Sequence, residues 1–369
     1  MDMEEQRWTE ITRKALQLRR QLHGMPEKAF CEVQTKGTLF RFLTENTNLE
    51  VVDRGSWFFA CKKATHATGG TAVALRADMD AVCGKDGVYG HYCGHDGHSS
   101  ILAGLALWLS REDVERDVYL IFQPAEEIGQ GAMQCVKLLE ERNIPEIYGL
   151  HNIPGHSLGS ILVRRGTFAC ASTGLEIRMT GTPSHAAYPE AGQNPGKPLA
   201  ELFLEVEEMT RTLREKGYLV WMTLIGMEIG GDSYGVSASD GVLRLTLRAE
   251  KQAVFEQYVQ DIEDRAKQRE DREGFALQLQ RIEYFPATEN TDAGAERVRA
   301  CADKLNLPVE ELQEPMRWSE DFGYYLQKAG GAFFGVGDGE NYPQLHTQAY
   351  EFPDEILPTA IRMFAELLK

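Results

Sequence analysis

A short stretch of the chain, residues 92–98 with the sequence YCGHDGH, carries one thiol, two imidazoles and one carboxylate. Two glycines within it permit a tight backbone turn. An apolar run at 101–109 follows directly and predicts a buried helix, so the polar cluster lies where a loop enters a helix. Thiolate, imidazole and carboxylate groups are the common protein ligands of zinc and similar cations. The stretch therefore predicts part of a metal site.

Further polar groups follow three short apolar runs, which are typical of buried parallel strands. Because strands and helices alternate over this part of the chain, the pattern predicts a mostly parallel α/β sheet. The carboxyl ends of such strands meet at one edge of the sheet, where ligands gather. The runs are 71–75, 118–122 and 147–150, and they are followed by Asp78 and Asp80, by Glu126 and Glu127, and by His151.

These groups suit hydrolysis at a pair of cations. Such a site needs several protein ligands on two metals and one carboxylate left to take a proton from water. Cys93, His95 and His151 are candidate ligands, together with a histidine late in the chain. Of the adjacent Glu126 and Glu127, one would bind metal and the other would act as base, and the residues alone leave their order open.

The order of the predicted strands and helices changes near residue 169. The order strand, helix, strand, strand, helix, strand predicts a ferredoxin-like α+β domain inserted at 169–285. Residues 1–168 and 286–369 would then form the catalytic metal-binding domain. The predicted elements of the insert are 175–179, 199–213, 218–229, 242–248, 252–269 and 275–282.

Length and charge restrict the class of protein. A chain of 369 residues exceeds what one core usually supports, so two domains are expected. A net charge of −17 disfavours nucleic acid or an anionic membrane as partner. No apolar run reaches the roughly 20 residues of a membrane span. The acidic first ten residues do not resemble a signal peptide, and the seven cysteines are odd in number, so we expect a reducing cytoplasmic location. The role of Cys83 stays open.

Five stretches together resemble the metal-dependent aminoacylase/carboxypeptidase amidohydrolases, a group that includes hippurate hydrolases, indoleacetyl-amino-acid hydrolases and N-acetyl-diaminopimelate deacetylases. The resemblance spans nearly the whole chain. It implies a catalytic domain with an inserted lid domain that usually forms a homodimer contact. The stretches are 75–82 (LRADMDAV), 91–100 (HYCGHDGHSS), 122–132 (FQPAEEIGQGA), 148–155 (YGLHNIPG), and the pair 319–337 and 345–352, which contain SEDFGYY and LHTQAYEF.

Position by position, the resemblance implies five metal ligands for two divalent ions, Zn or Mn. Cys93 and His95 resemble the paired ligands of the family's opening motif. Glu127 is similar to the ligating glutamate. His151 and His346 resemble the remaining ligands, one on each metal.

The same resemblance implies the catalytic groups. Glu126 lies where the family keeps its general base, and Asp80 matches the aspartate that orients a metal ligand. His185, in the inserted domain, resembles the histidine that steadies the oxyanion. Arg248, near the end of a strand in that domain, is a candidate for binding a substrate carboxylate, although a solvated surface charge is the plainer interpretation.

The implied reaction is hydrolysis of an amide bond in an N-acyl amino acid or small peptide, with water activated by the metals and Glu126 as base. A dipeptidase or carboxypeptidase of the same mechanism is an alternative. A second alternative uses Cys93 as nucleophile with His95, and a third is a catalytically inactive binding protein. No nucleic acid or membrane partner is expected.

Other polar residues of the region have structural interpretations. We expect His98 to support the ligands, Asp96 to cap the helix that follows, and Asp78 to pair with Arg76 on a loop. The loop at 84–90 looks shorter than in the family, which leaves the size of the substrate open.

Overall fold

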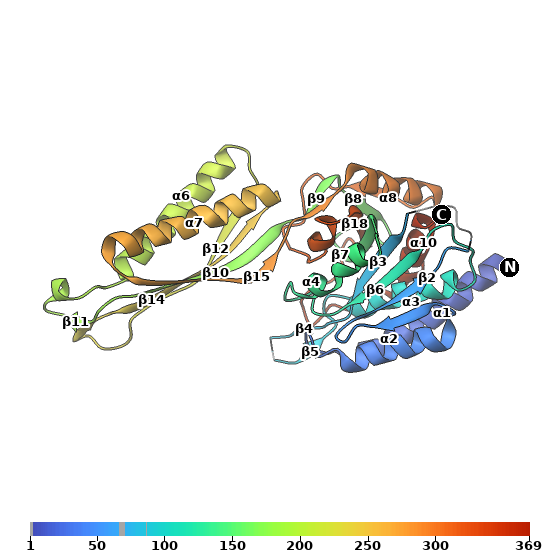
Figure 1. Ribbon diagram of the computed structural model, residues 1–369, viewed down its shortest axis with the longest axis horizontal. Coiled ribbons are helices and arrows are strands. Elements are labelled where there is room, and N and C mark those ends of the chain that lie inside the picture. Colours follow the sequence, from blue (N-terminus) through green and yellow to red (C-terminus); the bar gives the residue numbers. More distant parts are fainter. Residues whose placement is uncertain (1–2, 66–70, 86) are drawn as a thin grey trace. The chain divides into compact units, whose positions relative to one another are not determined.

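The computed structural model describes residues 3–65, 71–85 and 87–369 (Figure 1). The chain forms two compact units. The first comprises Met1–Phe168, Thr288–Pro315 and Asp321–Lys369, and the second comprises Ala169–Ala287 and Met316–Glu320. The short return of 316–320 to the second unit is a feature that the sequence pattern did not predict.

An eight-stranded sheet forms the centre of the first unit, and its central strands β6, β3, β7 and β18 run parallel. This arrangement confirms the predicted mostly parallel α/β class, with antiparallel pairing towards β1 and between β18 and β8. In spatial order the strands are β1 (Glu50–Asp53), β2 (Phe58–Lys62), β6 (Val118–Gln123), β3 (Val73–Asp78), β7 (Glu146–Pro154), β18 (Gly330–Gly339), β8 (Ile161–Val163) and β17 (Val309–Glu311).

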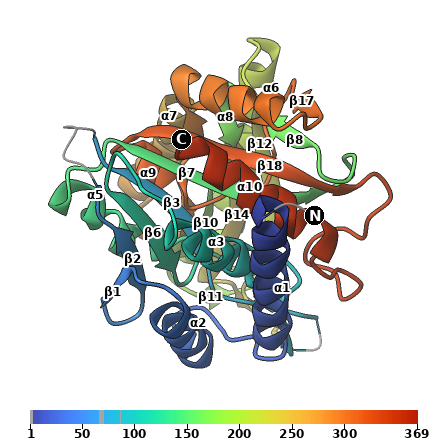
Figure 2. The same cartoon turned by 90° about the vertical axis from the view of Figure 1, so that its right-hand side faces the viewer.

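Helices cover this sheet and close one apolar core with it. Every residue of α3 (His95–Leu109) is buried, as expected for the apolar run behind the opening stretch. Figure 2 shows α1, α3 and α10 side by side, and these helices contact one another. The other helices of the unit are α2, α4, α5, α8 and α9. The bounds are α1 (Met3–His23), α2 (Val33–Asn46), α4 (Gly131–Cys135), α5 (Lys137–Glu141), α8 (Asp292–Lys304), α9 (Gly323–Leu326) and α10 (Leu357–Leu367).

The second unit has the predicted ferredoxin-like order of elements. Its four-stranded antiparallel sheet has the order β12, β14, β10, β15, and α6 and α7 cover one face (Figure 1). Along β10 the buried residues Leu175, Ile177 and Met179 alternate with more exposed ones, so one face of the sheet packs on the helices. The bounds are β10 (Ala171–Thr180), α6 (Gly196–Glu215), β12 (Val220–Ile229), β14 (Asp240–Ala249), α7 (Gln252–Glu273) and β15 (Ala276–Phe285).

Short elements complete both units. They are β4 (Val82–Cys83), β5 (Tyr89–Gly90), β9 (Gly166–Ala169), β11 (Ser184–His185), β13 (Val236–Ser237), β16 (Thr288–Asn290), η1 (Pro189–Ala191) and η2 (Asp354–Ile356). Within the described ranges, none of the helices is long and apolar enough to cross a bilayer.

One local expectation was wrong. His151 lies inside β7 instead of following it, because β7 continues along β18 to Pro154 after its pairing with β3 ends at Gly149.

Gly331 offers a test of how closely β18 packs on β7. Its φ is 131°, and an added Cβ would lie 1.8 Å from the Ile147 carbonyl oxygen. The neighbouring Gly330 has no such φ, and its nearest contact would be 3.6 Å. We expect Gly331→Ala to lower the free energy of unfolding by about 3 kcal/mol or more. Gly330→Ala is the matched control, and thermal unfolding that finds both variants equally stable would contradict the close packing.

Candidate metal centre

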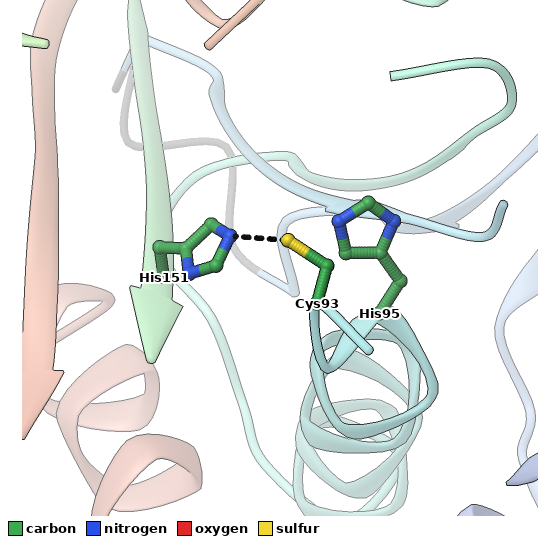
Figure 3. Close-up of side chains that lie close together, drawn as sticks. All are labelled: Cys93, His95 and His151. Carbon is green, nitrogen blue, oxygen red and sulfur yellow. Dashed lines mark hydrogen bonds between the residues drawn. The ribbon is translucent and has the colours of Figure 1, made fainter. Parts of the chain in front are cut away.

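A left-handed turn at Gly94 separates Cys93 and His95, the two residues of the opening stretch that lie among the other candidate ligands. Gly94, between Cys93 and the start of α3, has φ 93°, a value that glycine adopts without strain. An added Cβ there would lie 2.6 Å from the Asn152 side-chain oxygen. Cys93 and His95 flank this turn, and Figure 3 shows the Cys93 sulfur directed to His151 on β7, with the His95 ring on the other side of Cys93.

The Cys93 sulfur lies between two imidazoles. It is 3.4 Å from His151 Nε2 and 3.3 Å from His346 Nε2. His346, more than 250 residues later in the chain, has φ 62°, and its backbone N–H donates to the Tyr92 carbonyl at 2.8 Å. This hydrogen bond holds His346 next to the turn that carries Cys93.

Glu127 joins this group from the loop after β6. Its Oε1 is 3.6 Å from His95 Nε2 and 3.6 Å from His346 Nε2. Neither Glu127 Oε1 nor His95 Nε2 has a hydrogen-bond partner although both atoms are buried. Unsatisfied buried polar atoms are rare in folded proteins, and two that face each other indicate a place for a cation.

Asp80 contacts the ring of His95 and the backbone of Glu127. Its Oδ1 lies 3.2 Å from His95 Nδ1, and its Oδ2 accepts a hydrogen bond from the Glu127 backbone N–H at 3.0 Å. The His95 ring thus turns Nε2 towards Glu127. Burial lowers the pKa of His95, but Asp78 and Asp80 outweigh it and raise that pKa to about 10, so the field here favours positive charge.

Burial and nearby carboxylates make the acidic groups of the cluster harder to ionise. Burial raises the pKa of the Cys93 thiol well above its usual range, and Glu127 and Glu126 raise it further. Burial and Asp80 together raise the pKa of Glu127 to about 7, despite the opposing effect of His95. A bound cation reverses such shifts, because it stabilises thiolate and carboxylate. Burial, His98 and His95 hold the pKa of His151 well below normal, which favours the neutral imidazole that binds metals.

The donor set fits two cations. Three groups each hold their ligand atoms within 4.8 Å: Cys93, His95 and His151; Cys93, Glu127 and His346; and His95, Glu126 and Glu127. All five residues expected to bind metal therefore meet in one cluster.

Glu126 lies at the edge of the cluster, with Oε2 4.0 Å from His95 Nε2. Its other oxygen, Oε1, accepts a hydrogen bond from the Asp321 backbone N–H at 3.4 Å. The preceding residue, Ala125, has φ 51°, so the loop that carries both glutamates contains a non-glycine residue in the left-handed region.

A buried polar network behind the ligands was not predicted. Asp78 pairs with Arg76 at 2.6 Å as expected, but it ends β3 and is fully buried instead of lying on a loop. Arg76 and Gln123 both donate to Asp321, at 2.8 Å. No role was predicted for Asp321. Its place in the stretch 319–337, which resembles the family, was the only sequence signal that could have indicated one.

His98 supports the site as expected, with its ring nitrogens 2.7 Å from Asp78 Oδ1 and 2.6 Å from Asn152 Oδ1. Asp96 does not occupy the capping position, which belongs to Gly94, and lies inside the first turn of α3. Its Oδ1 accepts a hydrogen bond from the Gly97 N–H of that turn at 3.0 Å. Its Oδ2 pairs with Arg19 at 3.3 Å and His23 at 2.9 Å, which ties α3 to α1.

The remaining two candidates belong to the second unit. His185 is exposed, and its Nδ1 accepts a hydrogen bond from the Ala187 backbone N–H at 3.0 Å. In the neutral ring the proton must therefore lie on Nε2, which makes this nitrogen a donor. Arg248 is half-buried and donates through one nitrogen to the Arg317 carbonyl at 3.0 Å and to Ser319 Oγ at 2.9 Å. One nitrogen of its guanidinium is therefore held by neighbours in the second unit.

The fold and this cluster define a hydrolase-type site for two cations. The comparisons agree: the model of peptidase family M20/M25/M40 matches residues 74–369. The chain therefore belongs to this family, which confirms the resemblance seen in its motifs.

Curated relatives match over nearly their full length. The chain is 26% identical over 366 residues to an N-acetyldiaminopimelate deacetylase of Exiguobacterium sibiricum, covering 95% of this chain and 97% of the relative. It is 28% identical to an N-acetylcysteine deacetylase of Bacillus subtilis, covering 96% of each. It is 26% identical to a hippurate hydrolase of Campylobacter jejuni, covering 95% and 94%. A dinuclear metal-binding peptidase of the M20 family from Bacillus subtilis has the same fold, with a TM-score of 0.81, 24% identity and 98% coverage of both chains.

Metal analysis tests the cluster directly. We expect the protein to bind two equivalents of Zn or Mn, and His151→Ala and His346→Ala each to lose roughly one, because ligand removal leaves too few donors for a metal. His156→Ala is the control, since that imidazole pairs with Glu310 instead. Retention of both equivalents in the two ligand variants would contradict the assignment.

Proposed function

We propose that this enzyme, a metal-dependent amidohydrolase, hydrolyses the amide bond of small N-acyl amino acids. The observation that carries the proposal is the pair of adjacent glutamates. Glu127 faces His95 and His346 within the ligand cluster, while Glu126 lies beside it with one oxygen on the Asp321 backbone N–H. Such a pair provides one ligand and one base, as this reaction requires. The names of the deacetylase and hippurate hydrolase relatives support the substrate class.

Cys93, His95, Glu127, His151 and His346 would hold two divalent ions, with Zn favoured by the thiolate and imidazoles and Mn accommodated by the carboxylate. When bound, the ions supply Lewis acidity that polarises the substrate carbonyl and makes water more acidic. Asp80 keeps His95 and Glu127 in their ligating orientations.

Glu126 takes a proton from the attacking water and later returns it to the departing amine. The products are a carboxylic acid and an amino acid. His185 donates its Nε2–H to the oxyanion that develops on the carbonyl oxygen. The Arg248 fork receives the carboxylate of the substrate, using the N–H groups not engaged with Arg317 and Ser319.

We further propose a cytoplasmic homodimer formed through the second unit. Its edge strand β12 presents Leu224, Ile225 and Ile229 to solvent, with exposed fractions of 43%, 61% and 37%. An edge strand with exposed apolar side chains is suited to pairing with a second copy. Residues 169–285 would then serve as a lid and dimerisation domain.

A cysteine nucleophile is less well supported. Cys93 does approach two imidazoles, but burial and two glutamates raise the pKa of its thiol, whereas an activated thiol needs a lowered pKa.

A dipeptidase of the same mechanism differs only in its substrate. A panel of N-acetyl amino acids, N-benzoyl amino acids and dipeptides, assayed with Zn and then Mn, separates these activities. Turnover that survives complete metal removal would defeat the proposal.

Glu126→Gln tests the base. The amide keeps the size of the side chain but cannot accept the proton, so we expect kcat to fall by about 10²–10⁴-fold while two metal equivalents remain bound. Glu127→Gln is the matched neighbour, and we expect it to lose metal as well as activity. A Glu126→Gln enzyme with unchanged kcat would refute the base assignment.

His185→Ala tests the donor in the second unit. Removing one oxyanion donor lowers kcat by about 10²–10³-fold, with little change in metal content. His185→Gln retains an N–H donor and should recover part of the loss. Full activity of His185→Ala would show that this imidazole has no part in the reaction.

A further inference from the structure

The loop that carries Glu126 and Glu127, together with the start of α4 that follows it, is held by three buried carboxylates from elsewhere in the sequence. Glu32 accepts a hydrogen bond from the Ala125 backbone N–H at 2.8 Å, Asp80 from Glu127 N–H at 3.0 Å, and Asp321 from Ala132 N–H at 2.9 Å. Asp80 and Asp321 also bond to other groups of the centre. Glu32 is the member of this trio whose role has no explanation in the site described above.

Glu32 occupies an unusual position. It is the residue that precedes α2, where a side chain normally caps its own helix, but it makes no capping hydrogen bond. Glu27 satisfies the start of that helix instead, with its carboxylate accepting from Gln34 N–H at 3.1 Å and Thr35 N–H at 2.8 Å. The Glu32 side chain is thereby directed to the loop, and the residue is only 4% exposed.

Burying a carboxylate is unfavourable, and Glu32 shows the effect. Burial and the nearby Asp80 raise the pKa of Glu32 to about 7. Burial of such a group is less unfavourable where it is hydrogen-bonded, and the Ala125 N–H provides such a bond. Both the ionised and the neutral carboxyl accept a hydrogen bond, so the contact with Ala125 does not require charge.

The partner of Glu32 is the strained residue of the loop. Ala125 has φ 51°, a conformation that residues other than glycine, asparagine and aspartate seldom adopt. Its carbonyl accepts from Gln130 N–H at 3.3 Å and Gly131 N–H at 3.1 Å, so the turn is closed on the other side as well. Glu126 follows directly, so the direction of its side chain depends on the peptide group of Ala125, whose N–H binds Glu32.

We propose that Glu32 is a positioning residue for the reaction: by binding the Ala125 N–H it maintains the left-handed turn that directs the Glu126 carboxylate to the metal centre. The inference rests on the proposed role of Glu126 as base. It assigns a role in catalysis to a residue that touches neither substrate nor metal.

The test compares three substitutions at one position. Glu32→Met keeps the volume and removes the acceptor, and we expect kcat to fall by about 10–100-fold, with KM changed by less than about threefold and two metal equivalents retained. Glu32→Gln keeps an acceptor oxygen at the same reach and should stay within about threefold of the wild type. Glu32→Asp shortens the reach by one methylene, and a kcat between those of the other two variants is expected.

Glu27→Ala is the matched control, because it weakens the start of the same helix without touching the loop. It should lower the melting temperature and leave kcat within about threefold. Equal losses of kcat in Glu27→Ala and Glu32→Met would overturn the inference, as would a fully active Glu32→Met enzyme. If Glu32→Met does not fold, Glu32→Asp decides, and wild-type kcat in that variant counts against the proposal.

Amide hydrogen exchange separates this inference from the proposed function. Exchange across residues 123–131 should quicken in Glu32→Met and stay unchanged in Glu27→Ala. This readout needs no substrate. If the wild-type enzyme hydrolyses amides and Glu32→Met exchanges normally with full kcat, only the role of Glu32 is lost. If Glu126→Gln keeps its activity, the proposed base fails, whatever the exchange shows.

Discussion

Several acidic groups are buried close together in the first unit, and its structure depends on offsetting the repulsion between their negative charges. Burial, Glu127 and Glu126 raise the pKa of the Cys93 thiol, and burial and Asp80 raise that of Glu127. Asp78 and Asp80 add further negative charge beside His95. Isolated buried charges of this kind are strongly destabilising. They become favourable when a cation is shared among them, which is why the same cluster that looks overcrowded in acid groups is well suited to two metals.

The sheet provides the meeting point, but loops and turns set the directions of the side chains. Parallel strands β3, β6 and β7 bring their carboxyl-terminal parts to one edge. The side chains are then directed by left-handed residues at Gly94, Ala125 and His346. Strain of this type persists only where surrounding contacts enforce it. Here the contacts are hydrogen bonds from distant segments, such as His346 N–H to the Tyr92 carbonyl.

Local patterns made the fold class predictable and indicated Cys93, His95 and His151 as candidate ligands. The family resemblance was needed to select Glu127 and His346. Short apolar runs predict strands, and thiol, imidazole and carboxylate groups near their ends indicate where a cation would lie. The supporting contacts were not predictable in this way. Glu32 and Asp321 carry no pattern that links them to Ala125 and Ala132, which are 93 and 189 positions away. Asp96 was misjudged because a carboxylate near a helix start usually caps it, whereas here Arg19 and His23 on α1 compete for it.

The tasks proposed for the adjacent Glu126 and Glu127, one as base and one as ligand, pose a geometric problem. On an extended strand their side chains would point to opposite faces, and only one would reach the site. On a flexible loop both would be free to bind metal, and no base would remain. A strained turn resolves this conflict, because a fixed φ at Ala125 and a fixed peptide N–H at Glu127 give each carboxylate its own direction. In the proposed function, the division of labour between ligand and base would therefore be set by the backbone. The buried carboxylates that bind this backbone would then support catalysis together with the metal ligands.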